Sequence, residues 1–131
     1  MAEMSDYLEV KLLNLTLNGT SYAGMNNPFV SLHTSNPTDA GTPSTEKSGG
    51  SYTRVAASFA TASGTSGLVA TDADVTFPTA TTNLGTVAYI GLWDAVSSGN
   101  MLYHTALDTS KTIDVGDIFK ITTGNLTVEL A

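Results

Sequence analysis

Val87 to Ala95, with the sequence VAYIGLWDA, is the most apolar run of the chain and decides its fold class. No charged residue interrupts the run before Asp94. Its β-branched and aromatic side chains favour a strand. Because the apolar residues are nearly continuous instead of alternating with polar ones, the pattern is typical of a central strand that is covered on both faces.

Shorter strand patterns lie on both sides of this run. Residues 97–100 predict a hairpin loop that leads into the next strand. The expected strands are PFVSLHTS from Phe29 to Thr34, a segment beginning at Tyr52, LVATDADVTF at 68–77, MLYHTAL at 101–107, IFKI at 118–121 and LTVEL at 126–130, with DTSKTIDVGD at 108–117 as a turn. Strands and turns at such regular short spacing indicate a mainly β protein, either an antiparallel β-sandwich or a jelly-roll-like domain.

A short N-terminal helix is expected from about Asp6 to Asn14. Ser5 is a suitable N-cap, and Gly19 is a suitable stop signal. Leu8, Leu12 and Leu15 lie at helical spacing on one side. The alternative is a strand, because leucines alternate with Asn and Thr in LNLTLNG at 13–19.

A long loop is expected at 36–50, NPTDAGTPSTEKSGG, where Pro, Gly, Ser and Thr disfavour regular structure. At this length the loop is a candidate exposed arm. Gly49 and Gly50 end it and lead into alternating residues, of which Val55, Ala57 and Phe59 are expected to face the core. Arg54 is one of only 5 cations, and we expect it to fix the loop to a carboxylate, with Glu46 as a candidate.

Length and charge limit the classes of partner. The 131 residues predict a single β-rich domain over 1–131. A net charge of −7 makes nucleic acid and anionic membranes unexpected partners. No run reaches the roughly 20 apolar residues that span a bilayer, the start has no signal-peptide pattern, and the absence of Cys excludes disulfides and thiolate metal sites.

No residues suggest an enzyme or a cofactor site. The histidines, His33 and His104, fall in expected strands, and no G-x-S-x-G pattern accompanies them. The aspartate pairs, 72 with 74 and 114 with 117, are interpreted as strand-end and turn residues in preference to calcium ligands. Trp93 is expected to be a core or subunit-interface anchor in preference to a platform for sugars.

Four motifs resemble a known family. They are HTSNPTDAGT at 33–42, EKSGGSYTR at 46–54, VTFPTAT at 75–81 and YIGLWDA at 89–95. Their order and spacing resemble small tailed-bacteriophage proteins that are commonly labelled phage tail fibre proteins. The chain departs from the family pattern at Asn36, where Asp is frequent, at Thr53, where Ala is frequent, and at Leu92 and Trp93, which replace Ile and Phe.

The resemblance implies a structural protein of the virion, assembled in the host bacterial cytoplasm, and no catalytic residues. The expected role is in a tail fibre, baseplate or adaptor, acting by assembly with other virion proteins and as a homo-oligomer. Alternatives are a capsid decoration protein and a carbohydrate-binding module that recognises a host glycan through Trp93. The expected contact arms are the helix, with Tyr7 and Leu8, and the long loop, with Thr38 and Asp39; Arg54 and Trp93 complete the candidate interface residues.

Overall fold

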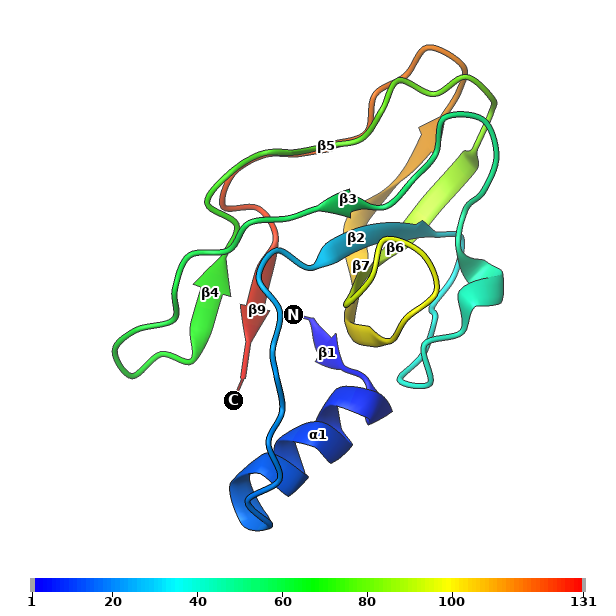
Figure 1. Ribbon diagram of the computed structural model, residues 1–131. Helices are drawn as coiled ribbons and strands as arrows, with labels where there is room; N and C mark the ends of the chain where they lie inside the picture. The colour runs from blue at the N-terminus through cyan, green and yellow to red at the C-terminus, as the bar shows by residue number, and fades with distance from the viewer. Residues whose placement is uncertain (1, 131) are drawn as a thin grey trace.

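Antiparallel pairing joins the strands into one five-stranded sheet and two short ribbons (Figure 1). The computed structural model describes residues 2–130. The elements are β1 (Glu3–Met4), α1 (Asp6–Leu17), β2 (Phe29–His33), the short 3-10 helix η1 (Pro43–Thr45), β3 (Val55–Ala56), β4 (Leu68–Ala70), β5 (Val75–Thr76), β6 (Gly85–Trp93), β7 (Met101–Ile113), β8 (Lys120–Ile121) and β9 (Thr127–Glu129). The prediction of a mainly β fold with one N-terminal helix is confirmed.

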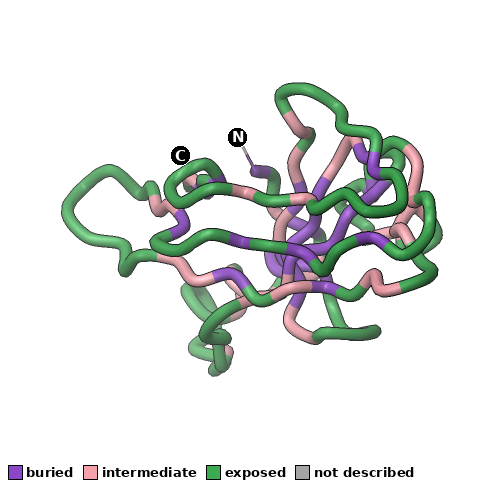
Figure 2. The backbone as a smooth tube through the Cα atoms, turned by 90° about the horizontal axis from the view of Figure 1, so that it is seen from above, coloured by how far each residue is buried: buried purple, intermediate pink, exposed green. Residues whose placement is uncertain are grey.

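The sheet has the strand order β1-β7-β6-β2-β3, and the ribbons are β4 with β9 and β5 with β8. β6 lies at its centre, as its apolar sequence predicts. One face of the sheet, with Val30, Leu32, Ile90 and Leu92, belongs to a hydrophobic core that also includes Phe77 and other residues of the ribbon segments. Figure 2 shows the buried backbone gathered where these strands run, whereas the outlying loops are exposed.

The segment at 68–77 is two short strands, β4 and β5, and the prediction of one continuous strand is wrong. The Asp74 carboxylate accepts hydrogen bonds from the backbone N–H and hydroxyl of Thr123, both at 2.8 Å. These bonds lower the pKa of Asp74 to about 2 and hold the chain where β4 gives way to β5. Each half then pairs with a different C-terminal strand, so the interruption is a consequence of tertiary contacts.

β7 continues to Ile113, although residues 108–113 were expected to belong to a turn. The first residues of β6 extend β7 to this point, because Gly85, Thr86 and Val87 pair with Ile113, Thr112 and Lys111. The turn begins only at Asp114, whose N–H donates to the Asp117 carboxylate at 2.9 Å. Cross-strand pairing therefore overrides a turn-like composition.

α1 begins as predicted and is longer than predicted. Ser5 is the N-cap, and its hydroxyl accepts a hydrogen bond from the N–H of Leu8 at 3.3 Å. The helix ends at Leu17 instead of Asn14, just before Gly19, which has a φ of +65°. None of the described helices has the length and apolar character needed to cross a membrane.

Replacing one core leucine and one exposed leucine tests this division into core and surface. Leu32→Ala is expected to lower the free energy of unfolding by about 2–5 kcal/mol, because it leaves a cavity in the core. Leu130→Ala, which alters an exposed leucine just after β9, is expected to change it by no more than about 0.5 kcal/mol. Urea denaturation followed by tryptophan fluorescence measures both, and similar losses in the two variants would contradict the assignment.

Candidate functional site

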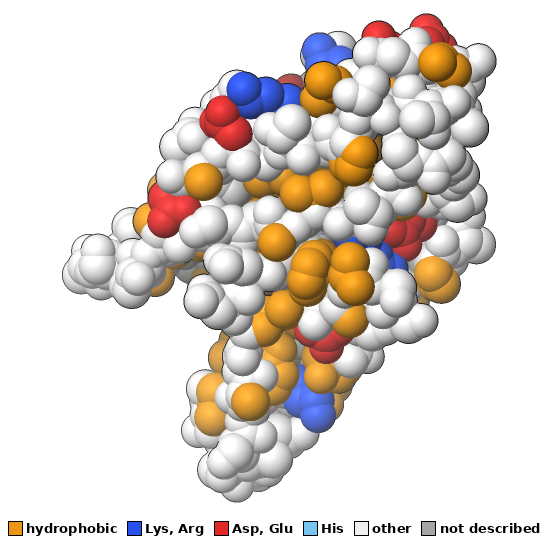
Figure 3. All heavy atoms as spheres, turned by 45° about the horizontal axis from the view of Figure 1, so that its top comes forward, with side chains coloured by type: hydrophobic (Ala, Val, Ile, Leu, Met, Phe, Trp, Pro, Cys, Tyr) orange, Lys and Arg blue, Asp and Glu red, His pale blue; other side chains and the backbone are white. Residues whose placement is uncertain are grey.

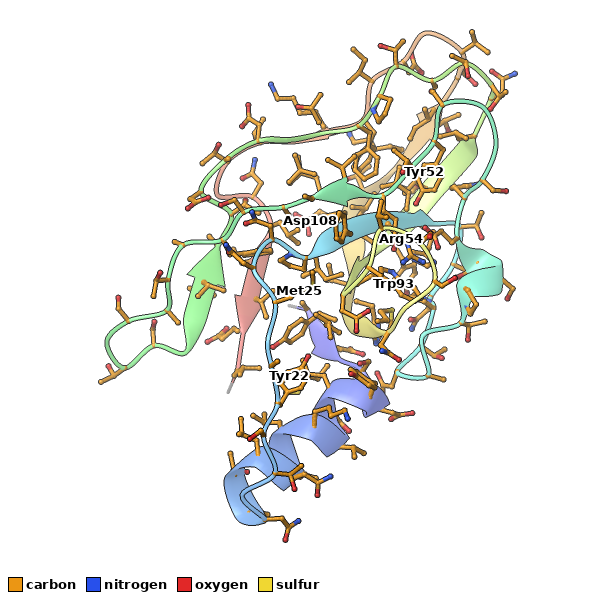
Figure 4. The ribbon with its side chains drawn as sticks, in the orientation of Figure 1. Tyr22, Met25, Tyr52, Arg54, Trp93 and Asp108 are labelled. Carbon is orange, nitrogen blue, oxygen red and sulfur yellow. The ribbon has the colours of Figure 1, made fainter. Side chains whose placement is uncertain are left out.

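The face of the sheet opposite the hydrophobic core carries a hydrogen-bonded group of side chains, here called the polar cluster. Side chains alternate along β2, so Ser31 and His33 point away from the face that Val30 and Leu32 occupy. The polar cluster consists of Ser31, His33, Thr45, Glu46, Tyr52, Arg54 and Trp93. Figure 4 shows Arg54 directly beside Trp93, next to β2.

Arg54 is the most connected residue of the polar cluster. Its Nε and Nη2 donate to the two carboxylate oxygens of Glu46 at 2.9 and 2.8 Å. Its Nη1 donates to the carbonyl oxygens of Ala95 and Ser98 at 2.9 and 2.8 Å. The guanidinium carbon lies 3.8 Å from the centre of the Trp93 ring. The prediction that Arg54 fixes the long loop through Glu46 is confirmed, and the same side chain also holds the hairpin after β6.

Glu46 is held as a carboxylate despite its burial. Burial alone raises the pKa of a carboxyl group, but hydrogen bonds from Arg54 and Tyr52 outweigh it and leave the pKa of Glu46 below its ordinary value. The Tyr52 hydroxyl donates to Glu46 at 2.8 Å and accepts from the N–H of Leu32 at 3.1 Å. Tyr52 thus connects the ion pair to the edge of β2.

A second chain of hydrogen bonds runs beneath the ion pair. The indole N–H of Trp93 donates to Ser31 Oγ at 2.7 Å, and Ser31 Oγ lies 2.6 Å from His33 Nε2. His33 Nδ1 lies 2.7 Å from Thr45 Oγ1, which itself donates to the Thr42 carbonyl. The Thr45 hydroxyl therefore accepts from Nδ1–H. Because burial lowers the pKa of His33 to about 4, the imidazole is neutral at pH 7, and its Nε2 accepts the Ser31 proton.

Gly91 creates the space for this second chain. A Cβ at Gly91 would lie 2.9 Å from both Ser31 Oγ and Trp93 Nε1. Gly91 lies directly opposite Ser31 on the neighbouring strand, so any side chain there would separate the indole from the hydroxyl. The polar cluster therefore requires glycine at position 91.

The contact between Ser31 and His33 is also the arrangement that a nucleophilic serine requires. Both side chains, however, are completely buried. Burial is the main cause that lowers the pKa of His33 to about 4; Glu46 opposes this shift and Arg54 adds to it. In this environment the pair connects the sheet to the long loop, and no substrate can approach Ser31.

The long loop at 36–50 is attached to the sheet and is not a free arm. The N–H of Thr34 donates to the Thr45 carbonyl at 3.0 Å, and that of Lys47 donates to the Leu32 carbonyl at 2.8 Å. A single β-bridge joins His33 to Glu46. The expectation of an irregular, exposed segment is therefore wrong for residues 45–47, which are half-buried and continue the edge of β2 where β3 has ended.

The six candidate interface residues lie in two groups. Arg54 and Trp93 meet inside the polar cluster. The N-terminal group joins α1 to the loop, because the Asp39 carbonyl accepts from the N–H of Asp6 at 2.9 Å. Leu8 is buried, whereas Tyr7 is half-buried, Thr38 is exposed, and the Asp39 carboxylate lies 2.8 Å from His104 Nε2. Their contact with a partner stays a prediction.

The surface of α1 carries an apolar stripe that the sequence analysis missed. Val10, Leu13 and Leu17 are 56%, 56% and 75% exposed. Their i, i+3, i+7 spacing places them on one side of the helix. On the opposite side Leu8 is buried and Leu12 is half-buried, whereas Leu15 is 42% exposed, although Leu15 was expected to share their side. The same helical count applied from Val10 predicts the exposed stripe from the sequence alone. Figure 3 shows hydrophobic side chains along the lower projection that α1 forms.

Removal of Arg54 tests the central ion pair. Arg54→Ala is expected to lower the free energy of unfolding by about 3 kcal/mol, because Glu46 is left buried without a counterion. The matched control is Lys120→Ala, which removes an exposed cation paired with Asp74 and is expected to cost less than about 1 kcal/mol. Denaturant titrations at pH 7 measure the free energy of unfolding of both variants. Equal losses would show that the buried ion pair contributes no more to stability than the exposed one.

The pH dependence of stability tests the buried imidazole. His33 binds a proton near pH 6.5 when unfolded but only near pH 4 when folded, so the unfolded state holds more protons between these values. Stability is therefore complete above pH 6.5 and falls with decreasing pH. This single group accounts for a loss of about 2 kcal/mol between pH 7 and pH 5.

The control for this effect is His33→Asn, which can still donate to Thr45 but does not titrate. The variant is expected to lose about 2 kcal/mol less than the wild type between pH 7 and pH 5. Parallel stability curves for the two proteins over this range would mean that His33 is not the group responsible.

Comparison with known proteins adds the family. No curated protein matches the sequence significantly. A family model described as "Podophage GP4 fiber I protein gp80" matches residues 3–129, which include both the polar cluster and α1. The resemblance to phage tail fibre proteins is thereby confirmed over nearly the whole chain. The chain belongs to this family of podophage fibre proteins.

Proposed function

We propose that this protein is a structural subunit of a podophage tail fibre and that it acts by binding copies of itself and other virion proteins. The fibre family supports a tail position over capsid decoration. The exposed stripe of Val10, Leu13 and Leu17 is the observation that supports assembly through α1. Three large apolar side chains on one side of a projecting helix are unfavourable in water and are stabilised when a partner covers them.

The partner that fits the stripe is α1 of a second copy. From Val10 to Leu17 an identical helix offers an equally apolar surface at the same spacing. Glu9 and Lys11 lie on opposite flanks of the stripe, so parallel copies related by rotation bring a carboxylate beside an ammonium group. In a closed ring of three or more helices, each Glu9 lies beside the Lys11 of a neighbouring copy.

A structural role is favoured over a catalytic one because the Ser31 and His33 pair is inaccessible. Recognition of a host glycan through Trp93 has the same difficulty, since the indole is covered by Arg54 and buried. Stacking on a sugar requires an open ring face. The proposal therefore places function on the outer surface of α1. Assembly in the host bacterial cytoplasm, before release in the virion, needs no disulfide.

Two substitutions in the stripe test the proposal. The wild type is expected to sediment as a trimer or larger oligomer, whereas Leu13→Glu with Leu17→Glu is expected to sediment as a folded monomer. The matched control is Val115→Glu with Ile118→Glu, which places the same two charges on exposed apolar residues after β7, at the other end of the molecule (Figure 1). This control is expected to remain oligomeric.

Virion incorporation is measured separately, by mass spectrometry of particles purified from cells that supply either variant. Particles are expected to contain the control and to lack the double variant in α1. A wild type that sediments only as a monomer would contradict self-assembly through α1. Absence of the wild-type chain from purified particles would overturn the structural role itself.

A further inference from the structure

We propose that Glu3, Asp39 and His104 bind a divalent transition-metal ion such as Zn²⁺ where β1, the long loop and β7 meet. One ligand atom from each side chain lies within 4.8 Å of the other two. An imidazole nitrogen with two carboxylate oxygens is a common ligand set for such ions. The inference goes beyond the proposed function, because it concerns an ion and not a protein partner.

His104 is the fixed member of this group. Its side chain is 2% exposed, whereas those of Glu3 and Asp39 are 71% and 51% exposed. Glu3 lies directly opposite His104 in the pairing of β1 with β7, which places the two side chains on the same face. The sheet thus holds one ligand in place and leaves the two carboxylates room to adjust.

The distances are close to those of a tetrahedral site. His104 Nε2 lies 2.8 Å from Asp39 Oδ1 and 3.8 Å from Glu3 Oε2. Ligand atoms bound at about 2.1 Å in tetrahedral geometry are about 3.4 Å apart, which lies between these values. A rotation of the exposed Asp39 side chain is sufficient to admit the ion.

The charges favour a cation at this position. Within residues 2–130, no Lys or Arg forms an ion pair with Glu3 or Asp39. A divalent ion would balance both carboxylates, which the imidazole alone cannot do when it is neutral.

Space for an ion and its water is present beside the cluster. A hollow of about 290 Å³ is lined by Glu3, His104, Asn36, Tyr89 and Asp108, among others. Asn36 and Asp108 contribute further oxygen atoms to its lining. A metal bound here could therefore complete its coordination with water or with one of these side chains.

The ion would connect three segments that are distant in sequence. Ser5 and Asp6, at the base of α1, donate hydrogen bonds to the carbonyls of Leu102 and Asp39. Asp39 is itself one of the proposed ligands, and Leu102 lies two residues before His104 on β7. Metal binding would thus strengthen the attachment of α1 to the body, and it would stabilise the folded protein because the unfolded chain does not hold the ligands together.

Metal titration of the full chain tests the site. Protein that has been treated with a chelator is titrated with ZnCl₂ and with CoCl₂, and Tm and the visible absorption of Co²⁺ are recorded. We expect one equivalent to bind, Tm to rise by several degrees, and Co²⁺ to show the absorption bands of a low-coordinate complex. Glu3→Gln and Asp39→Asn alter exposed side chains, so both variants are expected to fold and to bind at least tenfold more weakly.

The matched control is Asp72→Asn, which removes an exposed carboxylate between β4 and β5, outside both the cluster and α1, and is expected to bind like the wild type. The proposal is overturned if the wild type shows no change in Tm or absorption, or if the double variant Glu3→Gln with Asp39→Asn binds as tightly as the wild type. The Co²⁺ absorption reports the ligands of the ion and not the size of the oligomer, so this outcome leaves the proposed assembly through α1 unaffected.

Discussion

The buried ion pair between Arg54 and Glu46 is the contact on which the second face of the sheet depends. A guanidinium has five N–H donors and no acceptor, and here four directions are used at once, toward two carboxylate oxygens and two carbonyls. The acceptors lie outside the five strands of the sheet, in the long loop and in the hairpin after β6. Lysine could not replace this arrangement, because its ammonium group is a point charge without the planar fork.

The sheet has apolar packing on one face and hydrogen bonding on the other, and the two faces impose different constraints. Val30 and Leu32 require only apolar neighbours of suitable volume, a condition that several sequences could meet. Ser31, His33 and Trp93 require partners with defined direction, and their bonds form only because Gly91 leaves the space open. A polar cluster of this kind is stabilising when every member is satisfied and costly when one is missing. Among the described residues, no buried side-chain nitrogen or oxygen lacks a partner.

The features that could be predicted from the sequence are those set by local hydrophobic periodicity or by the small number of cations. The run at 87–95 is apolar enough to indicate a central strand, and Arg54 is one of so few cations that a carboxylate partner was a reasonable expectation. The interruption within 68–77 depends on Thr123, and the extension of β7 depends on Gly85 to Val87. No local pattern encodes either contact. The cluster of Glu3, Asp39 and His104 was missed for the same reason, since strand register brings Glu3 beside His104 and the course of the long loop brings Asp39 to them.

The arrangement separates the rigid part of the molecule from the part that is available for assembly. The polar cluster holds residues 45–47 of the long loop against the sheet, and Asp39 of the same loop lies at the base of α1. α1 itself has few contacts with the body beyond Leu8 and its first turn, and its outer stripe remains exposed. An interface on such a helix gains affinity when the helix is held in one orientation beforehand, because less freedom is lost on binding. The hydrogen bonds of Ser5 and Asp6, together with the ligand cluster beside them, lie where that orientation is set.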